Sequence, residues 1–244
     1  MRGIGAFAGA CLLAAIMISL PVSQGRAEDE TREQTLLVFS GFDLWRHGSF
    51  SHGGLLWSPN GLDRDGFTFK LLLGTGRYRY ISGALGNAKV IGDQLTGFAL
   101  PGWRVQQDKL IVTIFAGLDL QDHRLSPFDP GGSLHGTKTG LRGGFELWYE
   151  PDASSMLAAE AFASTIGASY DARLAYGWLL PGGFYAGPEI AGFRNGNDYH
   201  QIRAGAHVTA LKIADQEWSA ALGWASDSDH RDSLYGRLNL LLRR

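Results

Sequence analysis

Hydrophobic and polar residues alternate one by one along much of this 244-residue chain. In the clearest stretch, 110–123, Ile111 and Phe115 are the only apolar residues on an otherwise polar face. The side chains of a β-strand point alternately to its two faces, whereas a helix would scatter both sets around its circumference. The stretch is therefore predicted to be a β-strand. Its apolar face carries Leu110, Val112, Ile114, Ala116, Leu118 and Leu120.

The same alternation returns in segments of about ten residues divided by turn residues, which is the sequence pattern of a transmembrane β-barrel. Bacterial barrels have an even number of antiparallel strands, so both ends of the barrel lie on the same side of the membrane. The pattern predicts an all-β fold, an antiparallel transmembrane β-barrel of about 12 strands. The expected strands are 35–46, 49–57, 66–80, 88–104, 109–123, 137–150, 155–167, 169–180, 183–194, 198–211, 217–226 and 231–242.

Two connections between the expected strands are long. Residues 124–136 are rich in Pro and Gly and are expected on the outer side of the membrane, opposite the chain ends. Residues 58–65 fall on the periplasmic side, where turns between barrel strands are usually short. The alternating pattern does not explain why either connection is long.

A soluble periplasmic β-sandwich that binds glycan is the main alternative fold, because its strands also alternate. A solvent-exposed face would be rich in Lys and Glu, but here the polar positions are sparse and carry charges of both signs. Asp171 and Arg173, for example, fall on the same face of one expected strand. Such a mixture, together with 34 glycines, favours an enclosed lumen in which charges pair across the barrel.

The first 27 residues have the pattern of an export signal. Arg2 precedes an apolar run from Ile4 to Leu20, and small residues lead up to a cleavage point after Ala27. We expect residues 1–27 to be a cleaved signal peptide, 28–34 a short tail and 35–244 a single barrel domain. The protein is then expected in the outer membrane, with outer-membrane lipid around it.

Composition excludes several classes of function. A net charge of −2 gives no reason to expect a nucleic-acid partner. The single cysteine, Cys11, lies in the expected signal, so the mature chain holds no disulfide and no thiolate site. No H-E-x-x-H sequence is present, and the acidic stretch 227–232 lacks the Gly and the terminal Glu of a calcium loop. We therefore expect no metal and no cofactor.

An outer-membrane lipid hydrolase is a second alternative. His123 and His135 lie near Ser126 and Ser133 around the long connection 124–136, and a serine nucleophile needs such a base. The chain has no G-x-S-x-G sequence, however, and sequence separation does not bring the groups together. A protein without catalytic residues is the simpler expectation.

The polar faces of the expected strands supply the residues that would line the lumen. Barrels of about eight strands are filled by side chains and those of about sixteen open a channel, so twelve leaves both outcomes possible. Aromatic rings at Tyr78, Tyr80, Tyr185 and Tyr235 would suit contact with sugars at the lumen or its rims. The candidate lumen-lining residues are Lys70, Asp119, His123, Arg142, Glu146, Trp148, Glu189, Arg203 and Arg237.

Several sequence stretches resemble the cellulose biosynthesis protein BcsS family of alphaproteobacteria. The likeness starts with GFDLWRHGSFSHGGLLWSPNGLDRDGFTFKLLLG at 41–74 and spans nearly all of the expected mature chain. It continues in GFALPGW at 97–103, FAGLDLQDHRLSPFDPG at 115–131, LRGGFELWYEP at 141–151, ASTIGASYDARLAYGW at 163–178 and YGRL at 235–238. The resemblance implies a non-enzymatic accessory role in bacterial cellulose biosynthesis, assembly or export. Its partners would be cellulose or other components of cellulose synthesis.

Overall fold

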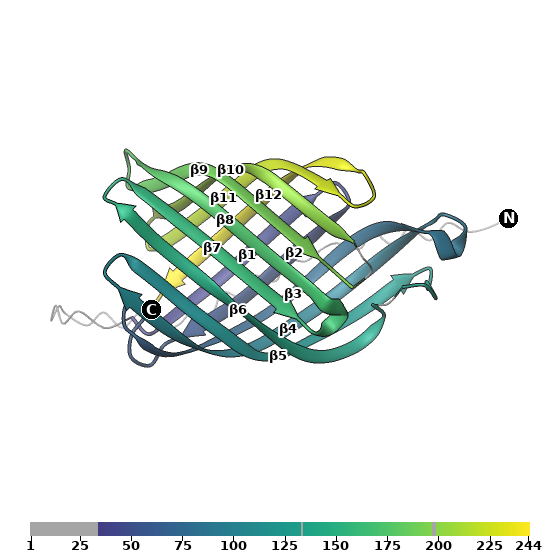
Figure 1. The fold of residues 1–244 in the computed structure, drawn as a ribbon, viewed down its shortest axis with the longest axis horizontal. Coiled ribbons are helices and arrows are strands. Elements are labelled where there is room, and N and C mark those ends of the chain that lie inside the picture. The colour runs from purple at the N-terminus through teal and green to yellow at the C-terminus, as the bar shows by residue number, and fades with distance from the viewer. Residues whose placement is uncertain (1–33, 133, 197–198) are drawn as a thin grey trace, which may run out of the picture. The chain divides into compact units, whose positions relative to one another are not determined.

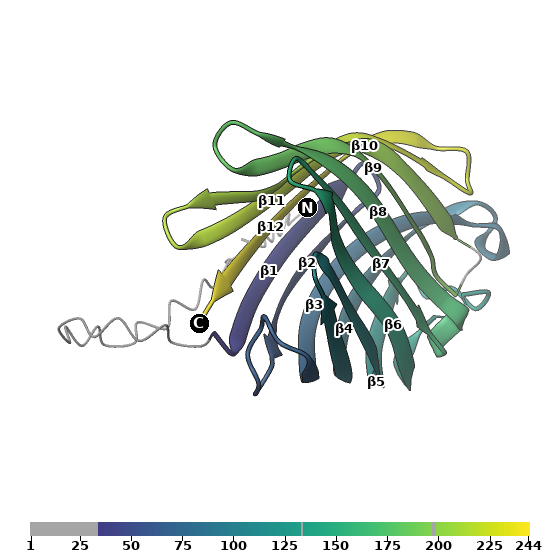
Figure 2. The same cartoon turned by 60° about the vertical axis from the view of Figure 1, so that its left-hand side comes forward.

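The chain folds into a closed barrel of twelve antiparallel strands in the computed structural model, which describes residues 34–132, 134–196 and 199–244 (Figures 1 and 2). Each strand pairs with its neighbours in sequence, and β1 pairs with β12 to close the barrel. The strands are β1 (Leu36–Trp45), β2 (Gly48–Trp57), β3 (Gly66–Ser82), β4 (Ala88–Gln107), β5 (Leu110–Ser126), β6 (Gly136–Asp152), β7 (Ser155–Ser164), β8 (Ser169–Leu180), β9 (Phe184–Arg194), β10 (His200–Ile213), β11 (Gln216–Asp227) and β12 (Asp232–Arg243).

This architecture confirms the predicted fold class, and all twelve predicted strands are present. Strand β7 is shorter than predicted, and the cause is local. The predicted strand continued to residue 167, but β7 ends at Ser164 and a short 3-10 helix, Ile166–Ala168, follows. Gly167 turns the chain there with a φ of 61°, a left-handed conformation that glycine adopts without strain. The predicted signal peptide, and the predicted tail except for its last residue, Gln34, lie outside the described residues.

The apolar face of each strand points outward. Ile114 and Leu118 on β5 are 63% and 67% exposed, whereas Thr113 and Asp119 on the opposite face are 2% exposed. A protein that exposed this many large apolar side chains to water would aggregate, so the surface is one that suits lipid. No helix in the described part of the chain is long and apolar enough to cross a membrane.

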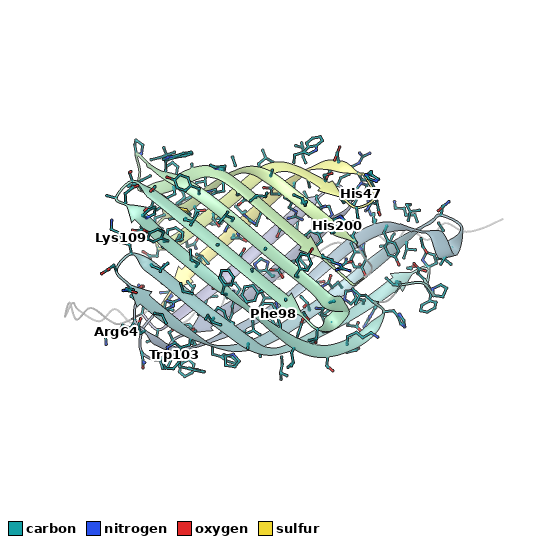
Figure 3. All side chains as sticks on the ribbon, viewed as in Figure 1. His47, Arg64, Phe98, Trp103, Lys109 and His200 are labelled. Carbon is teal, nitrogen blue, oxygen red and sulfur yellow. The ribbon has the colours of Figure 1, made fainter. Side chains whose placement is uncertain are left out.

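Large aromatic side chains mark the barrel end at which the described chain starts and finishes. Trp57, Trp103, Tyr149 and Trp178 lie at or near that end of their strands and are all more than a third exposed. Figure 3 shows Trp103 at this end, with Arg64 and Lys109 nearby, and His47 and His200 at the opposite end. Aromatic rings favour the membrane–water interface, so these side chains mark one border of the lipid-facing band.

Strands β3 to β6 have 17 to 20 residues each and extend past the rim at the opposite end (Figure 1). Their outward positions change there from apolar to charged. Arg77 pairs with Asp93 on the outer surface, and Arg124 pairs with Asp122. Because exposed charges are costly in hydrocarbon, this part of the wall lies beyond the membrane-spanning band.

The long connection 58–65 folds inward under the barrel. Leu62 is 3% exposed and packs with Leu56, Leu100 and Phe115. Its backbone nitrogen donates to the oxygen of Gln34, and its backbone oxygen accepts a hydrogen bond from Arg104. The length of this connection is therefore explained by its role in covering the lower core of the barrel.

Many glycines face the lumen because aromatic rings lie over them. A Cβ atom at Gly92 would lie 2.3 Å from Cζ of Tyr78, its partner on β3. A Cβ atom at Gly223 would lie 2.8 Å from Cε1 of Tyr235, which is itself 1% exposed. The high glycine content thus lets rings lie flat against the inner wall of a narrow barrel.

Candidate functional site

The barrel encloses a cavity of about 710 Å³, which is the candidate site. The cavity runs from Arg243, near the chain end, to Asn195 at the opposite rim. Its volume is in the range of pockets that hold small ligands. Seven of the nine candidate residues line the cavity, and the other two, Asp119 and Glu189, are buried in the wall beside it.

Lys70 on β3 forms an ion pair with Glu146 on β6. Its ammonium group also lies 5.3 to 5.6 Å from the ring centres of Phe39, Phe115 and Phe162. Cation–π contacts of this kind stabilise a charge that is partly removed from water. The pair therefore links β3 to β6 beside the apolar cluster that contains Leu62, to which Phe115 and Phe162 also belong.

Arg203 on β10 makes a comparable set of contacts higher in the barrel. Its guanidinium bonds to Asp43 at 2.9 Å and to Gln201 at 2.7 Å. It also lies 5.0 to 5.4 Å from the ring centres of Trp45, Phe193 and Tyr235. Arg203 is 6% exposed, so the aromatic rings and the carboxylate together replace its water.

Glu189 on β9 is the most connected carboxylate of the lumen. One oxygen accepts hydrogen bonds from Arg173 at 2.9 Å and from Arg237 at 2.5 Å. The other accepts from the Tyr235 hydroxyl at 2.9 Å. The Glu189 side chain has no exposed surface, so two arginines and a tyrosine from β8 and β12 hold it in place of water.

A polar chain rises along the inner face of β5. Gln121 donates to Asp119 at 3.0 Å, and His123 is 3.1 Å from Gln121 and 3.2 Å from the hydroxyl of Tyr78. Both ring nitrogens of His123 are thus occupied by groups other than a serine hydroxyl. The geometry gives no support to His123 as the base of a lipid hydrolase. Ser133 lies outside the described residues.

The remaining candidates lie at different heights in the lumen. Trp148 donates to Glu150 at 3.1 Å, and its ring meets the edge of Tyr185 with ring centres 5.8 Å apart. Arg142 pairs with Asp171 on β8 and stacks over Phe98. The nine residues therefore form several separate contacts along the barrel rather than one cluster.

Sequence analysis missed several partners of these residues. Asp43 and Trp45, both on β1, contact Arg203, although Asp43 and Arg203 are 160 positions apart in the chain. Asp171 and Arg173 share a face of β8, as expected, but each pairs with a residue on another strand. Only the alternation of β1 and β8 marks these residues as lumenal, and it does not indicate their partners.

Replacing both Arg142 and Glu146 with leucine is expected to lower barrel stability by about 1–2 kcal/mol, because Asp171 and Lys70 then lose their partners. The effect is moderate because Glu146 and Asp171 keep contact with water. The measurement is the temperature at which the folded band disappears in heat-modified gel migration. An unchanged transition temperature would show that these pairs do not brace the barrel.

Comparison with known proteins gives one family match and several matches in fold. A family model described as cellulose biosynthesis protein BcsS matches residues 37–244. No curated protein matches the chain by sequence.

Among solved structures, the chain is similar to the COG4313 outer membrane channel from Pseudomonas putida F1. The TM-score is 0.51 and the identity 12%, over 90% of this chain and 100% of that one. It is also similar to the beta domain of the Bordetella autotransporter BrkA, with a TM-score of 0.43 and 14% identity over 86% of this chain and 98% of that one. The first likeness shows that the fold is that of an outer-membrane barrel.

Proposed function

Because the chain belongs to the cellulose biosynthesis protein BcsS family, we propose that it is a non-enzymatic outer-membrane accessory protein in cellulose biosynthesis, assembly or export. The family match supports the assignment to cellulose biosynthesis, because it covers residues 37–244, which include all of the twelve strands except the first residue of β1. The outward apolar face supports the location, because it suits contact with lipid around the membrane-spanning part of the barrel wall.

The lumen supports a role in binding or support rather than in catalysis. Several of its charged side chains are engaged with one another, as Lys70 is with Glu146 and Glu189 is with Arg173 and Arg237. A catalytic acid or nucleophile needs to reach a substrate, whereas these groups contact other side chains of the barrel wall. The arrangement is that of a braced wall around a narrow cavity.

Deleting the gene is expected to reduce the cellulose that reaches the cell surface, while the cellulose synthase itself remains active in isolated inner membranes. The first quantity is measured as glucose released by cellulase from intact cells, and the second as incorporation of labelled UDP-glucose. The full chain supplied on a plasmid should restore surface cellulose. Equal surface cellulose with and without the gene would contradict the proposal.

A further inference from the structure

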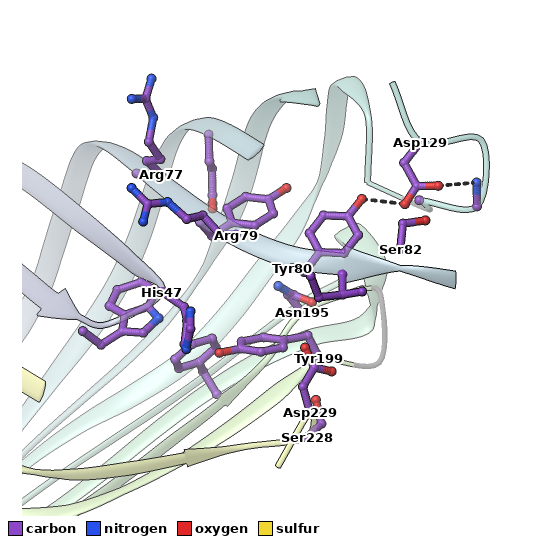
Figure 4. Close-up of a pocket in the computed structure, with 18 of the residues that line it drawn as sticks. His47, Arg77, Arg79, Tyr80, Ser82, Asp129, Asn195, Tyr199, Ser228 and Asp229 are labelled. Atoms are coloured by element: carbon purple, nitrogen blue, oxygen red, sulfur yellow. Dashed lines mark hydrogen bonds between the residues drawn. The ribbon is translucent and has the colours of Figure 1, made fainter. Parts of the chain in front are cut away.

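A second cavity, of about 460 Å³, opens at the barrel end opposite the start of β1 and the end of β12 (Figure 4). We call it the mouth cleft. One wall is the extended part of β3, and the other comes from the ends of β1 and β9 and from the connection before β10. It shares Trp45, Phe50, Gln94, Phe193 and Asn195 with the lumenal cavity, so the two cavities are adjacent. Its aromatic lining is Trp45, Phe50, Tyr78, Tyr80, Phe193 and Tyr199.

Two tyrosines form the aromatic wall on β3. Tyr78 and Tyr80 are two positions apart, with ring centres 6.2 Å apart and planes inclined by 23°. The Tyr78 hydroxyl is 3.2 Å from Nδ1 of His123, and Tyr80 donates to Asp129 at 2.8 Å. Because both hydroxyls are anchored, the two rings are held in fixed orientations along the cleft. Figure 4 shows Tyr80 between Asp129 and the cleft.

The facing wall is aromatic too. Trp45 meets Phe193 with ring centres 6.3 Å apart, and Phe193 meets Tyr199 at 5.9 Å. Tyr199 donates to Asp227 at 3.2 Å, so its ring is also fixed. Residues from four strands and one connection thus place rigid apolar rings on both sides of one cleft.

The charges around the mouth cleft are balanced locally. Two arginines, Arg77 and Arg79, and two aspartates, Asp129 and Asp229, line the cleft. Asp229 pairs with Arg231 at 2.7 Å. Burial raises the pKa of Tyr78 to about 12 and lowers the pKa of His47, so both are neutral near pH 7. A cleft that carries equal numbers of positive and negative side chains favours a neutral ligand over a polyanion or a polycation.

We propose that the mouth cleft binds a segment of a neutral β-linked glucan, with sugar rings lying against Tyr78 and Tyr80. In such a chain the hydroxyl groups are equatorial, so each sugar has apolar C–H faces and a polar edge. The faces match aromatic rings, and the edge meets polar groups such as Ser228. The choice of glucan rests on the proposed function, whereas the site itself rests on the geometry.

The test is isothermal titration calorimetry of the purified barrel in detergent with cellohexaose. Wild-type protein should bind cellohexaose more tightly than maltohexaose, which has the same composition but a curved chain. It should also bind cellohexaose more tightly than the anionic polymer polygalacturonate. Tyr80→Ala should weaken binding at least tenfold, and Tyr80→Phe, which keeps the ring, should bind within about threefold of wild type. Tyr149→Ala is the matched control, because Tyr149 is an exposed tyrosine on the outer face of β6, near the other end of the barrel, and lines neither cavity.

Folded protein is verified for every variant by heat-modified gel migration. The inference is overturned by absent binding at millimolar cellohexaose, by wild-type affinity in Tyr80→Ala, by equal losses in Tyr80→Ala and Tyr149→Ala, or by preference for the anionic polymer. If binding fails while the deletion strain still loses surface cellulose, the cleft assignment is wrong and the proposed function stands. If binding holds while the deletion strain keeps its surface cellulose, the proposed function is wrong and the cleft assignment stands.

Discussion

Replacing Glu189 with alanine is expected to lower the free energy of unfolding of the barrel by about 3–5 kcal/mol, the usual cost of removing one partner from a buried ion pair. The substitution leaves Arg173 and Arg237, which both bond to one Glu189 oxygen, without that carboxylate. It also removes the acceptor of the Tyr235 hydroxyl. The measurement is urea unfolding of the protein folded into lipid vesicles.

The matched control is Glu217→Ala. Glu217 lies at the start of β11, and its contact with Arg243, at 4.0 Å, is long and partly in water. Its removal should cost less than about 1 kcal/mol. Glu189→Gln should fall between the two, because it keeps a hydrogen-bond acceptor but loses the charge. Equal losses for Glu189→Ala and Glu217→Ala would refute the claim that Glu189 is a central brace of the barrel.

Replacing Ile114 with arginine is expected to cost about 2–4 kcal/mol of stability in a bilayer, because the side chain lies in the middle of the lipid-facing run of β5. Folding into lipid vesicles should be correspondingly reduced. This change tests the central structural claim, since an arginine on a water-exposed surface would have almost no effect.

The control for this experiment is Leu110→Arg on the same face of the same strand. Leu110 is the first residue of β5, next to the aromatic border, where a charge costs only about 0–1 kcal/mol. A clear difference between the two variants supports a membrane-spanning wall. If both are harmless in vesicles, the apolar face does not contact lipid.

The residue pattern alone was enough to predict the strands and their faces. The period of two along residues 110–123 separates Ile114 from Thr113, and the structure places the first outside and the second inside. The twelve segments and their turns also predicted a closed barrel, because closure removes the exposed edges of a sheet. The alternation of a strand depends only on neighbouring residues, so it can be recognised without knowing which distant residues the strand contacts.

The family resemblance likewise depended on sequence alone, through motifs spread from residue 41 to residue 238. The family model confirms it over 37–244. The lumenal candidates followed from the same alternation. Which residues among them are partners did not follow, because Arg203 and Asp43 come from strands at opposite ends of the sequence.

Only the tertiary structure decided what lies at the two ends of the barrel. The sequence predicted an unusually long turn at 58–65, whereas the structure shows that Leu62 in this connection belongs to the lower core. The mouth cleft joins Trp45, Tyr80 and Tyr199, which are far apart in the chain. Sequence periodicity determines which way a side chain points from its strand, whereas closure of the sheet, the strand register and the inward fold of the connections determine what it meets.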